Sequence, residues 1–287
     1  MNKTLMIVGN GAVENGWAPV DRAISSTLSE KKYTSSELFL ASLYFKISII
    51  LHDFIQKKNS ENVDRLIKFT SEYNFLIAQI EKEFTLSISR GEVRLRKNLL
   101  LKSFHHEAVD IVTTNWERTL SNEFHQKKIN YIHGSIATGD LYLPTSSTSD
   151  FSYVFNRVGV IEKRYCERLS TLKPENYAMI LKILSVGNKS LSSKFPFIHL
   201  LLNNSVSNVI FWGIGMNTYD SELISILESF IVHSDSVRNV LIIDPSKATE
   251  SKIRNIFRVN SRINVYSCNP NDKKSLRNAR SIMKKVF

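Results

Sequence analysis

Two polar residues that could take part in catalysis, Asn115 and His133, follow two short strand-like runs of the chain. Asn115 follows Val109 to Val112, which is typical of a buried strand, and His133 follows a second run, Ile129 to Ile132. A helix-like segment from Trp116 to about Phe124 separates the runs, which predicts two strands joined by one short crossover. Ligands of open α/β sheets bind outside the carboxyl ends of the strands, so we expect both residues to border one active site. The alternative for each residue alone is an N-cap Asn and a loop His.

Two glycine-containing segments follow other predicted strands. Gly9, Asn10, Gly11 and Ala12 come directly after the strand Leu5 to Val8, where backbone N–H groups can approach phosphate oxygens. The spacing is not a full G-x-G-x-x-G, so an ordinary strand-to-helix turn stays open as an alternative. A second pair, Gly213 and Gly215, follows the strand Asn208 to Trp212 and would let a ligand approach the backbone closely.

The last part of the chain alternates strands and helices. Val237 to Asp244 is a predicted strand, and an acid at the end of a strand, here Asp244, can hold ribose hydroxyls. Ile263 to Ser267 is the last strand. The closing helix places Leu276, Ala279, Met283 and Val286 on one face and its basic residues on the other.

Between the first glycine segment and Asn115, the pattern is helical. Long apolar helices are predicted to begin at Ser36 and Ser60, and after a break at Gly91 a basic helix is expected with Arg94, Arg96, Lys97 and Lys102. Further helices are expected in 160–186, with a break near Pro174, and in 195–203. The polar run within 136–155 is expected to be a loop, either a flap over the site or a connector.

These elements predict an α/β fold with a doubly wound, mostly parallel, Rossmann-like sheet. We expect one domain over residues 1–287, with a core from 1–30, 108–135 and 205–287. All-helical inserts would occupy 31–107 and 156–204.

Composition excludes several classes of protein. Hydrophobic residues make up 43% of the chain, which favours a packed globular core. The two cysteines, Cys166 and Cys268, cannot form a disulfide framework or a four-cysteine zinc site, so we expect no metal and a reducing, cytoplasmic location. Charged and polar residues interrupt the most apolar window, Leu38 to Ile55, so it predicts a buried helix rather than a membrane span.

The net charge of +11 is concentrated toward the carboxyl end of the chain. Between Lys247 and Lys285 there are eleven Lys or Arg residues and two acids, Glu250 and Asp272. This region either attracts nucleic acid, an acidic partner or dinucleotide phosphates, or is a solvated helix face.

The segment Thr113-Thr114-Asn115-Trp116-Glu117 followed by His133-Gly134 resembles the paired signature of the sirtuin family, whose Thr-x-Asn-x-Asp and His-Gly motifs flank the nicotinamide ribose of NAD. Glu117 stands where the family has Asp, and Gly215 where it has Ser. The segment from Gly16 to Arg22 is similar to the family's Gly-x-Pro-x-x-Arg. The motifs cover roughly half of the chain in the family's order, but the family's cysteine quartet for zinc is missing.

The resemblance implies an NAD-cleaving enzyme. Asn115 would orient the ribose and a water molecule, and His133 would be the general base. Contacts to NAD would come from the first glycine segment, Arg22, Thr114, Glu117, Gly213, Gly215 and Asp244. Since neither a zinc module nor an acyl-lysine groove is evident, water is the expected attacker. The chain then resembles the zinc-less sirtuin-like effectors that deplete NAD in bacterial anti-phage defence by abortive infection.

Two alternatives stay open at this point. One is an NAD-dependent protein deacylase, and the other is a non-catalytic nucleotide-sensing or nucleic-acid-binding subunit. The expected partners are NAD and either a second copy of the chain or a defence subunit such as an ATPase, an Argonaute-like protein or a sensor, without a membrane.

Overall fold

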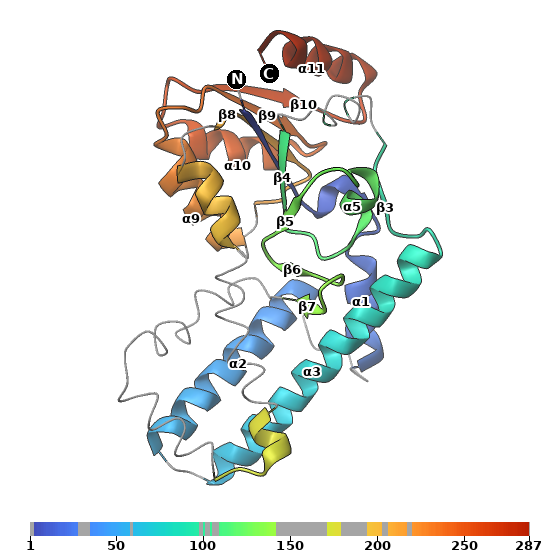
Figure 1. Ribbon diagram of the computed structural model, residues 1–287, viewed down its shortest axis with the longest axis vertical. Helices are drawn as coiled ribbons and strands as arrows, with labels where there is room; N and C mark the ends of the chain where they lie inside the picture. The colour runs from blue at the N-terminus through green and yellow to red at the C-terminus, as the bar shows by residue number, and fades with distance from the viewer. Residues whose placement is uncertain are drawn as a thin grey trace.

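The computed structural model describes residues 3–27, 35–57, 60–97, 100, 104, 109–141, 171–178, 194–202, 206–216 and 220–286. Its centre is a six-stranded sheet made of β1 (Lys3–Val8), β4 (Val109–Thr113), β5 (Ile129–Tyr131), β8 (Val206–Trp212), β9 (Asn239–Ile243) and β10 (Asn264–Cys268). Every pairing in this sheet is parallel, and the strand order is β10-β9-β8-β1-β4-β5 (Figure 1). The chain builds outward from β1 in one direction and then from β8 in the other. This confirms the predicted α/β class and doubly wound parallel sheet.

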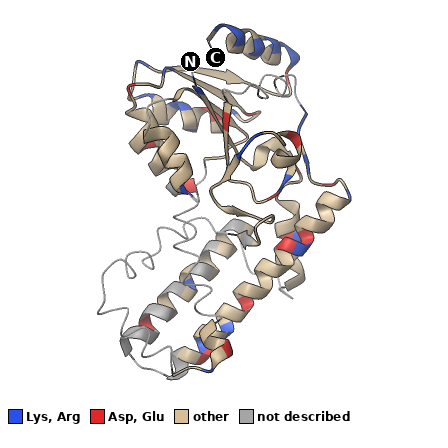
Figure 2. Ribbon diagram, viewed as in Figure 1, with Lys and Arg blue, Asp and Glu red and all other residues tan. Residues whose placement is uncertain are grey.

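Helices cover both faces of the sheet, as a parallel sheet requires. They are α5 (Thr119–Glu123), α9 (Ser221–Leu227) with its π-helical continuation η3 (Glu228–Val232), α10 (Lys247–Phe257), α11 (Lys273–Val286) and the helical residues 194–202. Helix α1 (Ala18–Thr27) packs instead into a separate core with two long helices. Helix α11 is the most basic of them (Figure 2). Its buried side chains are Leu276, Ala279 and Met283, as its periodicity predicts.

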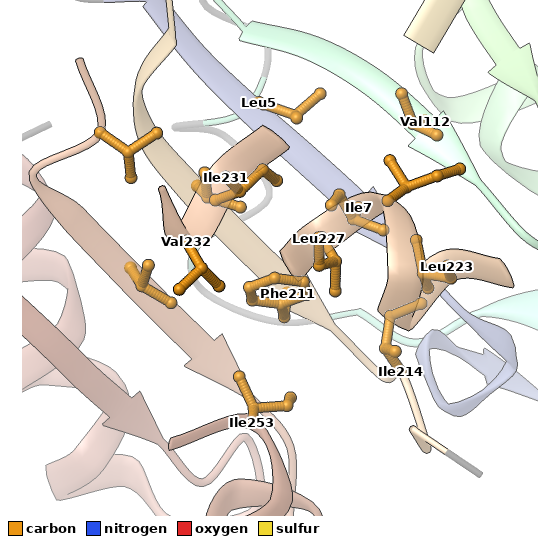
Figure 3. Packing of buried hydrophobic residues seen from close by; sticks show 14 of the residues in the cluster. Leu5, Ile7, Val112, Phe211, Ile214, Leu223, Leu227, Ile231, Val232 and Ile253 are labelled. Atoms are coloured by element: carbon orange, nitrogen blue, oxygen red, sulfur yellow. The ribbon is translucent and has the colours of Figure 1, made fainter. Parts of the chain in front are cut away.

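The two faces follow from the alternation of side chains along each strand. In β1, Leu5 and Ile7 pack into one core with residues of α9, η3 and α10 (Figure 3). Met6 and Val8 pack into the other core with residues of α5 and α11. Because both faces are buried, β1, β4 and β8 consist mostly of apolar residues, which is the pattern that identifies them in the sequence.

A third core lies where α1 packs against two long helices, α2 (Ser36–Lys57) and α3 (Ser60–Ser89) (Figure 1). Leu66, Tyr73, Ile80 and Phe84 of α3, spaced four or seven residues apart, are buried in this core. One face of α2 is buried, with Leu40, Leu43 and Ile47, while its opposite side is exposed.

The segment after α3 differs from the predicted basic helix. Arg94 and Leu95 form the short strand β3, which pairs antiparallel with β2 (Val13–Glu14). Arg94 also pairs with Glu14 at 2.5 Å. The prediction of a helix was therefore wrong for Arg94 to Lys97, whereas Lys102 lies outside the described residues. Basic residues alone do not indicate such a short strand, because its partner, β2, is about eighty residues earlier in the sequence.

The expected loop after His133 begins with a small hairpin. Gly134–Ser135 (β6) pairs antiparallel with Asp140–Leu141 (β7), so the start of 136–155 is not loop throughout. Residues 142–155, the greater part of the expected flap, lie outside the described residues. So do 160–170 and 179–186 of the helices expected on either side of Pro174, whereas 174–178 are helical.

Within the described part of the chain, none of the helices combines the length and the apolar character that crossing a membrane would need.

Candidate functional site

A cavity of about 290 Å³ opens at the carboxyl ends of the strands, next to the point between β1 and β8 where the sheet reverses its winding. Doubly wound sheets bind their ligands at this position. Sixteen residues line it: Gly9, Asn10, Gly11, Gly16, Trp17, Phe84, Thr114, Asn115, Trp116, Glu117, His133, Gly213, Ile214, Gly215, Asp220 and Asp244. The cavity therefore joins the ends of β1, β4, β5, β8 and β9, together with α3.

The two glycine segments pack directly on each other. The N–H of Gly9 donates to the carbonyl oxygen of Trp212 at 2.9 Å, and that of Gly11 donates to the carbonyl oxygen of Gly213 at 2.9 Å. A Cβ atom on Gly11 would lie 2.9 Å from the Cα atom of Gly213, and one on Gly213, whose φ is +64°, would lie 2.1 Å from the backbone nitrogen of Ala12. These glycines permit two backbones to cross in contact.

This crossing changes the role expected for Gly9 to Ala12. The N–H of Ala12 donates to the carbonyl oxygen of Gly9 at 3.0 Å, so three of the four N–H groups in the segment are used within the protein. Among the described residues, only the N–H of Asn10 in this segment has no backbone acceptor. A cradle of four N–H groups for phosphate is therefore not what the segment forms.

Asn115 is 6% exposed and its amide is held in one orientation. Its Nδ2 donates to the carbonyl oxygen of Gly9 at 3.3 Å and to Oε1 of Glu117 at 3.1 Å. Its backbone N–H donates to Oγ1 of Thr113 at 3.0 Å, which fixes the turn that ends β4. Both amide hydrogens have acceptors, so Oδ1 is the atom of this amide that can still accept a hydrogen bond. No described residue donates to it. Buried acceptors are rarely left in this state, so Oδ1 is suited to a ligand or a water molecule.

Glu117 is 1% exposed. Its Oε1 accepts hydrogen bonds from Asn115 and, at 2.8 Å, from Oγ1 of Thr119, while Oε2 has no partner among the described residues. Burial raises the pKa of this carboxyl group, and the two side-chain hydrogen bonds only partly offset that effect. The group is therefore held toward its neutral form, in which a carboxyl can donate as well as accept.

His133 lies two residues beyond the end of β5 and is 5% exposed. The N–H of Ile132 donates to the carbonyl oxygen of Thr113 at 3.0 Å, which extends the pairing of β4 and β5 up to the histidine. Gly134 then turns the chain into β6 with a φ of +75°. Parallel pairing of two adjacent strands thus brings His133 and Asn115 to the same cavity, as the sequence predicts.

Asp244 follows β9 and also lines the cavity. Burial raises the pKa of its carboxyl group, and the N–H of Ser246, which donates to Oδ1 at 2.8 Å, lowers it in part. Asp244 is thus placed at the end of the cavity formed by β8 and β9, away from the ends of β4 and β5.

An aromatic wall, formed by Trp17, Phe84 and Trp116, is the part of the cavity that the motifs did not indicate. The ring centroids of Trp17 and Trp116 are 5.6 Å apart, and Phe84 packs edge-on against Trp116 at 6.5 Å. The indole Nε1 atoms of both tryptophans are buried and have no acceptor among the described residues. The only sequence signals for this wall were Trp116 inside the Asn115 motif and Trp17 beside Gly16.

Ten of the twelve predicted site residues line the cavity, and Ala12 and Arg22 do not. The guanidinium of Arg22 pairs with Glu83 of α3 at 3.0 Å and with Glu92, just beyond α3, at 3.2 Å, and it contacts Ser87. An arginine committed to two carboxylates in this way ties α1 to α3.

Comparison of the chain with protein-family models, curated proteins and solved structures gives no match. The chemistry of the site therefore has to be argued from the motifs and the geometry. In the part of the chain that the structure describes, no three His, Cys, Asp or Glu residues lie together in a group that could hold a metal ion.

Proposed function

We propose that this protein is an NAD glycohydrolase, which cleaves NAD to nicotinamide and ADP-ribose. The observation that carries the proposal is the fixed amide of Asn115, whose Oδ1 is left without a donor in a cavity that His133 also lines. The sirtuin-like motifs support it, because the first glycine segment, the Asn115 motif, the His133 motif and the second glycine pair all follow strands that border this cavity.

The chemistry fits these two groups. Breaking the bond between nicotinamide and C1′ of the ribose leaves the bonding electrons on the pyridine nitrogen and develops positive charge on the ribose. A carbonyl oxygen such as Oδ1 of Asn115 can stabilise that charge or orient a water molecule. His133 takes the proton from the attacking water as its oxygen bonds to C1′. Nicotinamide leaves as a neutral molecule, so the reaction releases one proton overall.

The size of the cavity suggests which half of NAD it binds. At about 290 Å³ it is at the lower end of small-molecule pockets, so we assign it to the reacting nicotinamide riboside half. The aromatic wall offers a flat surface for the nicotinamide ring. The adenosine half would run along the strand ends toward Asp244, whose carboxyl group can accept from ribose hydroxyls.

The cellular role that we infer follows the resemblance alone: depletion of NAD in the cytoplasm by an anti-phage effector that a trigger or a partner subunit activates.

The test is release of nicotinamide from NAD by the purified protein and by two pairs of variants. Asn115→Ala and His133→Ala are compared with Asn122→Ala and His125→Ala, which change the same residue types at exposed positions nearby. We expect each of the first pair to lose about a hundred- to ten-thousand-fold in rate, and the second pair to match the parent.

Thermal melting establishes that each variant is folded. Parent-like turnover in a folded Asn115→Ala or His133→Ala protein would refute the role of that residue. Nicotinamide release only in the presence of an acylated peptide would assign the deacylase activity instead.

A further inference from the structure

The exposed face of α11 is a one-sided positive surface. It carries Lys273, Lys274, Arg277, Arg280, Lys284 and Lys285, all exposed, and the helix contains no acidic residue (Figure 2). None of the six forms an ion pair with any described residue. The acid directly before the helix, Asp272, accepts instead from the N–H groups of Lys274 and Ser275 at the helix start.

The geometry of the helix lines up four of these charges. At about 100° per residue, Lys273, Arg277, Arg280 and Lys284 fall within an arc of about 60°, and the stripe they form is about 16 Å long. The buried side chains Leu276, Ala279 and Met283 are centred about 100° around the helix from this stripe. The stripe therefore runs along the side of the helix next to its buried face, and all four of its residues are exposed.

This arrangement opposes the stability of the helix. Neighbouring charges in the stripe are three or four residues apart, where like charges repel. Lys273 and Lys274 also lie in the first turn, where the helix dipole disfavours positive charge. If this face only had to be soluble, acidic residues at some of these positions would make the helix more stable.

Helix α10 provides the contrast within the same protein. Its Lys247 and Arg254 both pair with Glu250, at 3.4 and 2.9 Å, and just beyond it Arg262 pairs with Asp235 at 3.0 Å. Because α10 packs on the opposite face of the sheet from α11, the basic region seen in the sequence divides into two parts. The basic residues of α10 and just beyond it are largely paired with acids, whereas those of α11 form no ion pair with a described residue.

We propose that the α11 stripe binds the phosphate backbone of nucleic acid, without reading its sequence. On each strand of B-form DNA there is one phosphate for about every 3.4 Å of the helix axis, so a stripe about 16 Å long faces several phosphates of a duplex. Arg and Lys contacts to phosphate position a protein on a duplex and carry no base specificity. DNA and RNA share this chemistry.

An anionic membrane is the less suitable partner. Helices that bind membrane surfaces insert their apolar face, and the apolar face of α11 is already part of the core. The basic stripe also lacks the aromatic residues that anchor such helices at the interface.

The test measures the fluorescence anisotropy of labelled DNA and RNA duplexes of mixed sequence, with the full-length protein at several salt concentrations. The α11 variant Arg277→Gln/Arg280→Gln/Lys284→Gln is compared with Lys247→Gln/Arg258→Gln/Arg262→Gln, which removes the same charge from α10 and the residues that follow it. All six side chains are exposed, and none belongs to a hydrophobic core. Circular dichroism checks that each variant is folded.

For the parent, we expect log K to fall with log salt with a slope of about −3 to −4, and the α11 variant to reduce its magnitude by about two to three. The α11 variant should bind at least tenfold more weakly at low salt, and the α10 variant should resemble the parent. The single variants Arg277→Gln and Lys284→Gln should each remove about one from the slope, which provides the measurement if the triple variant is unstable.

Three results would overturn the proposal. These are no duplex binding by the parent at about 50 mM salt, equal weakening by the two triple variants, or stronger α11-dependent binding to phosphatidylserine vesicles or polyglutamate than to either duplex. Since the readout is binding without NAD, failure here leaves the glycohydrolase proposal to its own test.

Discussion

The side-chain amide of Asn115 donates from Nδ2 to Oε1 of Glu117 at 3.1 Å, so a buried carboxyl group sets the direction of the amide. Thr119 donates to the same oxygen at 2.8 Å and holds the carboxyl in place. Glu117 thus has a positioning role that can be separated from contact with a substrate.

Replacing Glu117 tests this role. Gln can keep an acceptor oxygen toward Asn115 and Thr119, and it is uncharged like the protonated acid. We expect Glu117→Gln to retain nicotinamide release within about tenfold, and Glu117→Leu to lose about a hundredfold because the amide is no longer oriented. The measurement is kcat on NAD for both folded variants. Equal, large losses in both would instead indicate that the acid itself takes part in the chemistry.

The same carboxyl group makes stability depend on pH. Burial raises the pKa of Glu117 in the folded state above its usual value of 4.5, so the folded chain binds more protons than the unfolded chain between these two values. Its contribution to the free energy of unfolding is present below pH 4.5 and is lost as the pH rises through the folded-state pKa. In urea titrations, Glu117→Gln should gain stability relative to the parent as the pH rises from 4.5 through the folded-state pKa. A difference independent of pH would contradict the raised pKa.

The contact of Gly11 with Gly213 predicts that Gly11→Ala acts on the whole site. The added methyl group must push apart the two strand ends, which typically costs about 1–3 kcal/mol and should also reduce turnover. Gly91→Ala is the control, since Gly91 has a φ of +69° but nothing lies within 4 Å of an added Cβ atom. Gly91→Ala should lower the melting temperature, because a positive φ strains any residue other than glycine, and it should leave kcat unchanged. Unchanged stability and activity in Gly11→Ala would mean that the crossing is looser than described.

The aromatic wall predicts an optical signal. Trp17 and Trp116 line the cavity, and the third tryptophan, Trp212, is buried in the sheet beside Phe104. If nicotinamide, the expected product, binds in this cavity, it should quench the intrinsic fluorescence of the parent and of Trp212→Phe. The double variant Trp17→Phe/Trp116→Phe should show little quenching. Quenching that persists in the double variant would place the ligand elsewhere.

At the opposite end of the sheet, three asparagines form a ladder across β8, β9 and β10. Asn239 donates to Asn208 at 2.9 Å and accepts from Asn264 at 3.4 Å. Asn239→Leu leaves buried Asn208 without its partner, and we expect a loss of about 1–3 kcal/mol in the free energy of unfolding. Asn208→Leu/Asn239→Leu should cost less than the sum of the single changes, because no polar group is then stranded. If the losses in the free energy of unfolding from the two single changes add up to the loss from the double change, the hydrogen bond between Asn208 and Asn239 contributes nothing to stability.

The parallel sheet and the meeting of Asn115 with His133 could be predicted from the sequence. Apolar β-branched runs identify strands buried on both faces, and the residue after each run lies at the carboxyl end of its strand. A short crossover makes two such strands neighbours, so the convergence of these two residues depends mostly on local sequence.

Only the tertiary structure decided how the other polar and aromatic groups are used. The N–H of Gly11 meets the carbonyl oxygen of Gly213, two hundred residues later, because β8 pairs with β1, and no periodicity within either segment encodes that pairing. For the same reason Arg22 is engaged by acids of α3 and its flank, and Phe84 of α3 reaches the cavity. Strand ends are defined by local sequence, whereas hydrogen-bond partners and cavity walls depend on which distant segments pack together.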